Sequence, residues 1–294
     1  STPGMTTAGL LRDADIAMYE AKRAGKSQIK IFDPAMRLSA SRHLEFRSDL
    51  SNAIERGQLR LVYQPMVDLQ THRVVGAEAL LRWEHPTRGT VLPSEFIPIA
   101  ERAGLIVPIG NWVMEQSIRA ASRWQARGPQ QLNVNVSGGQ IRSPEFVEQV
   151  RASLQTSGLD PRRVTLEITE TMLVEEIESA GRNLAELRKL GVLIALDDFG
   201  TGYSSLSYLQ RFPVDVIKID RQFIDELDEH PRSATLARMI LQLTSGLDMV
   251  SVAEGIERPT QLRALKALGC HLGQGSLLSE PLEAAHLERC FGVA

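Results

Sequence analysis

Two adjacent aspartates, Asp197 and Asp198, end the short apolar run at residues 192–198. Neighbouring carboxylates repel each other by roughly 1–4 kcal/mol at about 4 Å, depending on the effective dielectric. The chain contains eight short apolar runs of this kind. Six of them carry polar groups at or near their ends: Glu78, Asn135, Glu167, Asp197 with Asp198, Lys218 with Asp220, and Glu254. Gln274 lies beside the eighth run. One lysine cannot balance five carboxylates, so the pattern predicts a cation-binding site.

The residue types indicate which cation this site would take. Oxygen ligands without paired His or Cys favour Mg²⁺ or Mn²⁺ over zinc. Two adjacent acids can serve two ions together, and two metals about 3.5–4 Å apart are the standard device for in-line displacement at a phosphodiester. A single acid after a strand is ordinarily a helix cap or a solvated turn. Six such coincidences make that interpretation a poor one for the whole set.

Short runs rich in β-branched residues are predicted to be the buried strands that position these groups. The runs are residues 59–64, 74–82, 132–137, 164–169, 192–198, 215–220, 250–255 and, weakly, 270–275. Helical patterns occupy residues 41–57, 143–158, 175–191, 233–247 and 259–269. Ser143 is expected to cap the second of these helices, with Pro144 in its first turn. Alternating strands and helices predict a (β/α)8 barrel, in which active sites gather at the C-terminal ends of the strands.

One connection departs from a regular barrel. Only nine residues separate Gln64 from Val74, whereas a parallel crossover needs about a dozen or more, usually including a helix. The first two strands are therefore predicted to form an antiparallel hairpin. The expected fold is α/β, a modified (β/α)8 TIM barrel with strand 1 antiparallel to the rest.

Composition excludes several classes of protein. No apolar run reaches the roughly 18 residues of a membrane span, and no signal peptide opens the chain. The net charge of −3 and pI near 6.1 argue against binding of a nucleic-acid polymer, which needs a basic footprint. Two cysteines, Cys270 and Cys290, give neither a disulfide framework nor a zinc spacing and favour a reducing compartment. The start without Met indicates a segment of a longer protein.

Seven motifs, in this order, resemble those of the EAL-domain phosphodiesterases of bacteria. They are EALLRW (78–83), VNVS (134–137), LEITE (166–170), LDDFGTGYSSL (196–206), IKID (217–220), AEGIE (253–257) and GQG (273–275). YQP (63–65) and PSEFIPIAERAGLI (93–106) agree as well, so the resemblance covers about residues 41–290. It implies hydrolysis of cyclic di-GMP, a bacterial second messenger, to linear pGpG with Mg²⁺ or Mn²⁺, on a modified (β/α)8 barrel.

The first forty residues form a separate region. A helix is predicted at residues 13–27 and a strand at 28–32, which is too little to build a core of its own. Residues 13–32 are similar to the last helix and strand of GGDEF domains, without the signature loop of that domain. We therefore expect residues 1–40 to be a GGDEF remnant plus linker and residues 41–294 to be the EAL barrel. A linker helix is the alternative for the remnant.

The resemblance also implies a role for each site residue. The first metal would be held by Glu78, Asn135, Glu167 and Asp197. Asp197 would bridge to a second metal, completed by Asp198 and, directly or through water, by Glu254. A water between the two ions would attack phosphorus in line, and Lys218 would orient it or stabilise the phosphoryl oxygens. The catalytic set implied is thus Glu254, Lys218, Asp197 and Asp198, and the residues implied to contact the dinucleotide are Gln64, Arg82, Asp220 and Gln274.

A glycine-rich segment and two departures complete the resemblance. DFGTGYSS (198–205) is similar to a family loop linked to metal retention and dimerisation, and Glu170 resembles the acid that anchors it. A first-turn helix acid is the alternative for Glu170. The family usually has an aromatic residue at the position of Ser276 and a basic one at that of Glu280. The negative charge of Glu280 is expected to weaken dinucleotide binding.

Two other functions compete with this interpretation. A cyclic di-GMP receptor that does not cleave usually lacks a metal acid, and none is missing here. An enolase-like barrel needs a large N-terminal capping domain, for which forty residues are too few. The resemblance further implies a homodimer in the bacterial cytoplasm, with GGDEF and sensor domains upstream that would also supply any membrane tether.

Overall fold

The structure is a computed structural model of the chain. It describes residues 6–23, 29–33, 36, 45–124, 128, 130–175, 177–200, 209, 212, 214–227 and 229–291. The chain divides into two compact units, Ser1–Gly57 and Gln58–Ala294. Among the described residues, no helix combines the length and apolar composition that a membrane span requires.

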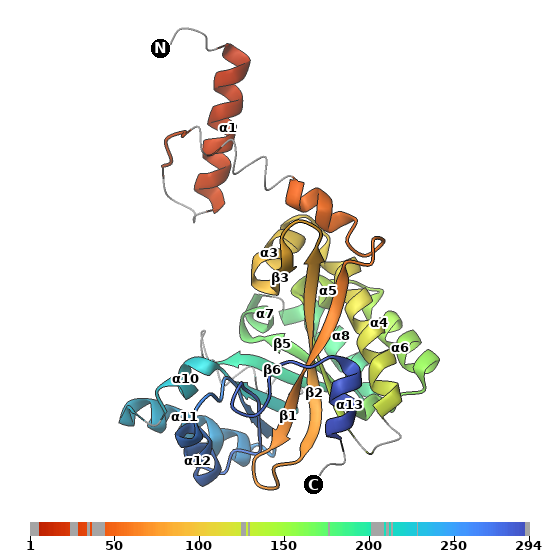
Figure 1. Ribbon diagram of the computed structural model, residues 1–294, viewed down its shortest axis with the longest axis vertical. Coiled ribbons are helices and arrows are strands. Elements are labelled where there is room, and N and C mark those ends of the chain that lie inside the picture. The colour runs from red at the N-terminus through yellow and green to blue at the C-terminus, as the bar shows by residue number, and fades with distance from the viewer. Residues whose placement is uncertain are drawn as a thin grey trace. The chain divides into compact units, whose positions relative to one another are not determined.

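A closed barrel of eight strands forms the second unit (Figure 1). The strand order is β1-β9-β8-β7-β6-β5-β4-β2, and pairing of β1 with β2 closes the ring, while β3 extends β2 beyond it. The strands are β1 Leu59–Asp68, β2 Val74–His85, β3 Gly89–Val91, β4 Gln131–Asn135, β5 Val164–Thr169, β6 Leu193–Phe199, β7 Val216–Ile219, β8 Val250–Ala253 and β9 Leu272–Gly273. The predicted barrel is confirmed; only the short β3 had no predicted counterpart.

The first two strands form the antiparallel hairpin that the short connection predicts. β1 runs antiparallel to both β2 and β9, and the other neighbours within the ring are parallel. The turn is stabilised by Asp68, whose Oδ1 accepts hydrogen bonds from the backbone N–H groups of Gln70 at 2.9 Å and Thr71 at 2.7 Å. His72 takes a left-handed φ of 59° in this turn.

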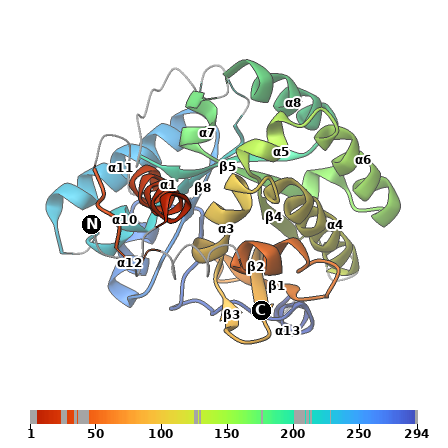
Figure 2. The ribbon, with the colours of Figure 1, turned by 90° about the horizontal axis from the view of Figure 1, so that it is seen from above.

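The helices of the second unit surround the barrel strands (Figure 2). Those described are α3 Pro93–Arg102, α4 Ile106–Trp124, α5 Gly138–Arg142, α6 Phe146–Ser157, η2 Pro161–Arg163, α7 Glu170–Glu175, α8 Ile177–Lys189, α10 Arg221–Asp225, α11 Pro231–Gly246, α12 Pro259–Ala267 and α13 Ala284–Cys290. The predicted helices α6, α8, α11 and α12 are present, with shifted ends.

The start of α6 differs from the prediction. Ser143 ends α5 as its C-cap, and Glu145 is the N-cap residue of α6. The Ser143 hydroxyl donates to Glu145 Oε2 at 2.5 Å, so it does not accept a bond from the first turn of α6 as a capping serine would.

The first unit was predicted less well. Its helix α1 spans Thr7–Arg23 and therefore starts earlier than residue 13. Residues 29–33 form neither helix nor strand, and the predicted residue 28 lies outside the described residues. The side chains of Ile29 and Ile31 are 96% and 86% exposed, and no strand among the described residues pairs with this segment. In the predicted 41–57 helix, residues 45–51 are helical and 52–57 form turns.

An apolar layer supports the polar one inside the barrel. Ala195, Val216 and Val252, from three neighbouring strands, pack together with Leu272. Alternate side chains of a strand share one face. The polar groups two positions further along therefore lie on the same interior face, one layer nearer the C-terminal ends of the strands: Asp197, Lys218, Glu254 and Gln274.

Candidate active site

The ammonium group of Lys218 lies at the centre of four carboxylates. Its Nζ is 2.6 Å from Glu254 Oε1, 2.9 Å from Glu167 Oε2, 3.1 Å from Glu78 Oε2 and 3.3 Å from Asp197 Oδ1. The Lys218 side chain is only 1% exposed. The structure thus brings together, from five parts of the barrel, residues that the sequence pattern had singled out separately.

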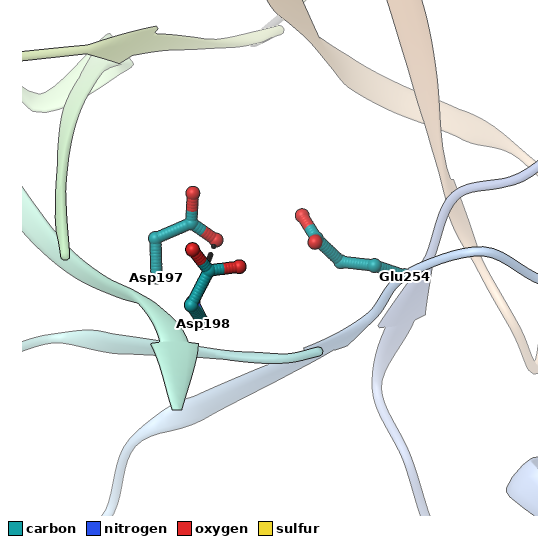
Figure 3. Close-up of side chains that lie close together, drawn as sticks. All are labelled: Asp197, Asp198 and Glu254. Carbon is teal, nitrogen blue, oxygen red and sulfur yellow. Dashed lines mark hydrogen bonds between the residues drawn. The ribbon is translucent and has the colours of Figure 1, made fainter. Parts of the chain in front are cut away.

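A bulge lets two successive aspartates face one side. Successive residues of a regular strand point to opposite faces, but the register between β6 and β7 shifts between Leu196 and Phe199. Asp198 lies within this bulge and has a left-handed φ of 53°. As Figure 3 shows, the carboxylates of Asp197, Asp198 and Glu254 lie near one another; each offers an oxygen, and these oxygens are within 4.8 Å of one another.

Side-chain amides fix the orientation of the glutamates. Asn135 Nδ2 donates to Glu78 Oε1 at 2.6 Å. Gln274 Nε2 donates to Glu78 Oε2 at 2.7 Å and to Glu254 Oε1 at 3.0 Å. Both oxygens of Glu78 therefore have neutral donors in addition to Lys218, and Gln274 connects two strands of the site.

Asn133 is a member of the site that the sequence interpretation missed. Its Nδ2 donates to Glu167 Oε1 at 2.7 Å, and both side chains are buried. A signal was present: Asn133 lies two residues before Asn135, so the period of a strand places both on the interior face. Only the residue nearer the end of the strand had been singled out.

The carboxylates do not all ionise easily in this setting. Burial raises the pKa of Glu254 to about 7. Lys218 lowers this pKa and Asp197 raises it, but burial has the largest effect. Burial and the neighbouring Asp197 raise the pKa of Asp198 to about 6. Burial and Glu78 raise the pKa of Glu167 well above its usual range. A cation among these groups would favour their ionised forms and so lower all three pKa values.

Glu78 and Lys218, in contrast, are stabilised in their charged forms. Burial alone would raise the pKa of Glu78, but Lys218 and the hydrogen bonds from Gln274 and Asn135 lower it. Burial alone would lower the pKa of Lys218, but the surrounding carboxylates, Glu167 first among them, raise it well above its usual range. Glu78 and Lys218 are thus a charged pair.

The predicted substrate residues lie around this centre. Gln64 on β1 is opposite Glu78 on β2, and its Nε2 donates to the backbone oxygen of Ser279. Asp220 caps α10 by accepting from Gln222 N at 2.9 Å. Asp220 also forms a side-chain hydrogen bond with Asp198 that contributes to the raised pKa of Asp198.

Arg82 lies further out along β2 and lines a cavity of about 390 Å³. Its Nη1 donates to the backbone oxygen of Leu81 at 2.8 Å. Glu280, the acidic departure from the family pattern, lines the same cavity, together with Arg60, Val62, Pro281, Leu282, Glu283 and His286. A larger cavity of about 910 Å³ adjoins Asn135 and is lined mainly by residues of α3, α4 and α5.

Glu170 contacts the start of the glycine-rich segment. Its Oε2 accepts a hydrogen bond from the backbone N–H of Gly200 at 3.2 Å, and the residue is buried. Residues 201–205 of that segment lie outside the described residues. The contact with Gly200 bears on the anchoring role of Glu170, which stays a prediction.

The donor set suits a hard divalent cation. All the candidate ligands are carboxylate or amide oxygens, and Asp197, Asp198 and Glu254 gather three carboxylates whose oxygens lie close together. Mg²⁺ and Mn²⁺ prefer such oxygens. The closed barrel and this acidic cluster at its C-terminal strand ends define an α/β-barrel protein with a candidate divalent-metal centre.

The particular family follows from comparison with known proteins. The EAL domain family matches residues 47–281, and the chain belongs to this family. The bifunctional diguanylate cyclase/cyclic di-GMP phosphodiesterase MucR of Pseudomonas aeruginosa is 41% identical over 286 residues, which are 97% of this chain and 42% of MucR. An uncharacterised Sinorhizobium fredii protein is 42% identical over 94% of this chain and 33% of its own length. The chain thus spans less than half of these relatives.

Solved structures agree with the family. The phosphodiesterase PaMucR in complex with c-di-GMP has a TM-score of 0.79 and 41% identity, covering 83% of this chain and 99% of that one. The FimX EAL domain from Pseudomonas aeruginosa bound to c-di-GMP has a TM-score of 0.76 and 25% identity, covering 81% and 96%. Both of these structures hold c-di-GMP, and the first of them is a phosphodiesterase.

Proposed function

We propose that this chain hydrolyses cyclic di-GMP to linear pGpG, using two divalent cations and water as the nucleophile. The observation that carries the proposal is the convergence of an all-oxygen donor set on Lys218, at the C-terminal ends of the barrel strands. The 41% identity to MucR supports the choice of substrate. No acid of the predicted metal set is replaced, which favours an enzyme over a receptor that does not cleave.

Two groups of residues would hold the cations, Mg²⁺ or Mn²⁺. Glu78, Asn135, Glu167 and Asp197 would hold the first, while Asp197, Asp198 and Glu254 would hold the second. When bound, such cations lower the pKa of a coordinated water and neutralise charge on phosphoryl oxygens.

The protein's own groups position the substrate and balance charge. Lys218 holds four carboxylates in place and remains protonated, so it also offers a positive charge toward a phosphoryl oxygen. Arg82 presents a planar fork that suits a phosphate, and Gln64 lies opposite Glu78 on the hairpin. The cavity beside Asn135 provides space, mostly apolar, for a base extending away from the acids.

The wider organisation is also part of the proposal. Residues 1–40 would be the end of an upstream GGDEF domain, followed by the EAL barrel from residue 41. The chain would act as a cytoplasmic homodimer, and Glu170 would anchor the segment linked to dimerisation through its contact with Gly200.

A product assay tests the proposed activity. Purified protein is incubated with cyclic di-GMP and Mn²⁺, and the nucleotides are separated by chromatography, with a matched sample in EDTA as control. We expect pGpG as the product with Mn²⁺ and none in EDTA. Intact substrate after prolonged incubation with Mn²⁺ would contradict the proposal and favour a receptor.

A further inference from the structure

We propose that Asn133 is a positioning residue that holds Glu167 in the orientation needed for cation binding. This inference rests on the proposed function, in which Glu167 is a metal ligand. Asn133 is not part of the motifs that carry the family resemblance, so the inference depends on the structure alone. Asn133 would not contact substrate or cation itself but would act through the glutamate.

The position of Asn133 on β4 directs it to Glu167. Asn133 is opposite Thr165 on β5, and Asn135 is opposite Glu167. The amide of Asn133 therefore reaches diagonally to the glutamate one pleat further along and donates to its Oε1 at 2.7 Å. The exposed fractions of Asn133 and Glu167 are 2% and 1%, so the barrel interior shields this bond from solvent.

The two oxygens of Glu167 have different partners. Oε1 accepts from Asn133, and Oε2 is 2.9 Å from Lys218 Nζ. A hydrogen bond from β4 and an ion pair from β7 thus orient the carboxylate between these two strands. Removing the Asn133 donor would leave Oε1 buried without this bond and let the carboxylate rotate about its remaining ion pair.

The chemistry of an amide suits this task. Lys218 is a cation and competes with a metal for the same carboxylate oxygen. Asn133 is neutral, so its contact persists without repelling an incoming cation. An aspartate here would add another negative charge to a crowded group, and an aliphatic residue would offer no donor. Partners that orient a metal ligand in this way typically contribute about 10–100-fold to metal affinity.

A double-mutant cycle tests whether Asn133 acts through Glu167. The variants are Asn133→Leu, Glu167→Ala and the double mutant. The control is Thr165→Val, a change at a buried residue on the neighbouring strand β5. Mn²⁺ affinity is measured by titration calorimetry on protein whose folding is verified by circular dichroism. Asn133→Ala replaces Asn133→Leu if the latter does not fold.

We expect Asn133→Leu to weaken Mn²⁺ binding by roughly 10–100-fold, Glu167→Ala to weaken it at least as much, and the pair to be no weaker than Glu167→Ala. Thr165→Val should leave the affinity unchanged. Loss in Glu167→Ala without loss in Asn133→Leu would overturn this inference and leave the proposed site intact. Unchanged affinity in Glu167→Ala would overturn the ligand role of Glu167, and the inference with it. Equal losses from Asn133→Leu in both backgrounds would also overturn it.

Discussion

Two neighbouring clusters of the site differ in how their charges are balanced. The inner cluster (Glu78, Glu167 and Lys218) contains two carboxylates and one ammonium group, with side chains 7%, 0% and 1% exposed. The outer cluster (Asp197, Asp198 and Glu254) contains three carboxylates, and its Asp197 and Glu254 share Lys218 with the inner cluster. Because both clusters rely on this ammonium group, the three acids of the outer cluster are left with more uncompensated negative charge than the two of the inner cluster, and a cation from solution would offset it. Glu78 and Glu167 are also proposed ligands of the first metal, so the clusters differ in charge balance and both would contribute to metal binding.

The largest effect is expected in the outer cluster, at the residue shared by both proposed metals. Asp197→Asn should abolish turnover and lower the metal content while the fold survives, because an amide offers one neutral oxygen where the carboxylate would bridge. The loss of metal affinity should exceed the roughly 10–100-fold effect of removing a residue that only orients a metal ligand. Turnover with Mn²⁺ and bound metal per chain are measured. Turnover like that of the wild type would refute the bridging assignment.

A change in the inner cluster should also lower the stability of the metal-free fold. Lys218→Met removes the ammonium group from four carboxylates, and losing one partner of a buried ion pair costs about 3–5 kcal/mol. We expect the free energy of unfolding of the metal-free protein to fall by about this amount, as measured by urea denaturation in EDTA.

Arg60→Gln is the matched control for the change at Lys218. It removes a cation whose pair with Glu84 is 40% exposed on both sides, so its effect should be about 0–1 kcal/mol. Equal losses of unfolding free energy in the two variants would show that the buried ion pairs of Lys218 stabilise the fold no more than an exposed pair does.

The pH dependence of stability should separate the metal-free from the metal-loaded protein. The pKa values of Glu254 and Asp198 are raised to about 7 and about 6, so the metal-free folded state binds more protons than the unfolded chain above about pH 4. The metal-free protein should therefore lose stability as pH rises toward 7, by on the order of 1–3 kcal/mol. With Mn²⁺ the ionised carboxylates bind the cation, and stability should rise over the same range. Denaturation at pH 5 and pH 8 with EDTA or Mn²⁺ measures both trends, and a metal-free protein more stable at pH 8 would contradict them.

The smallest effect is expected at the edge of the substrate site. Glu280→Lys should tighten cyclic di-GMP binding or leave it unchanged, because it replaces a negative charge in the cavity that Arg82 lines. Affinity is measured by titration in Ca²⁺ or EDTA, with Glu148→Lys on α6 as a control of equal charge change. A clear loss at residue 280 alone would show that Glu280 makes a favourable contact with the dinucleotide.

The fold was predictable where one local constraint decided the outcome. The nine-residue connection after Gln64 excluded a parallel crossover, and the hairpin followed. The presence of the strands followed from β-branched runs, but several of their ends lie elsewhere than predicted, as in β1, which runs on to Asp68. Ser143 was misassigned because a side-chain contact with Glu145 replaced the expected cap.

The site was predictable in its residue types and not in its contacts. Alternation along a strand would separate Asp197 from Asp198, and only the bulge seen in three dimensions brings both to one side. The fourfold contact of Lys218 depends on the register of several strands. Asn133 was missed because its partner lies 34 positions away in the sequence, although its spacing from Asn135 indicated the shared face.

The central claim is that acids from separate barrel strands bind a pair of divalent ions, and diffraction from crystals grown with Mn²⁺ tests it most directly. We predict two anomalous peaks about 3.5–4 Å apart, with the Asp197 carboxylate between them and Asp198 and Glu254 beside the second. The absence of both peaks, with these carboxylates turned away from one another, would contradict the account.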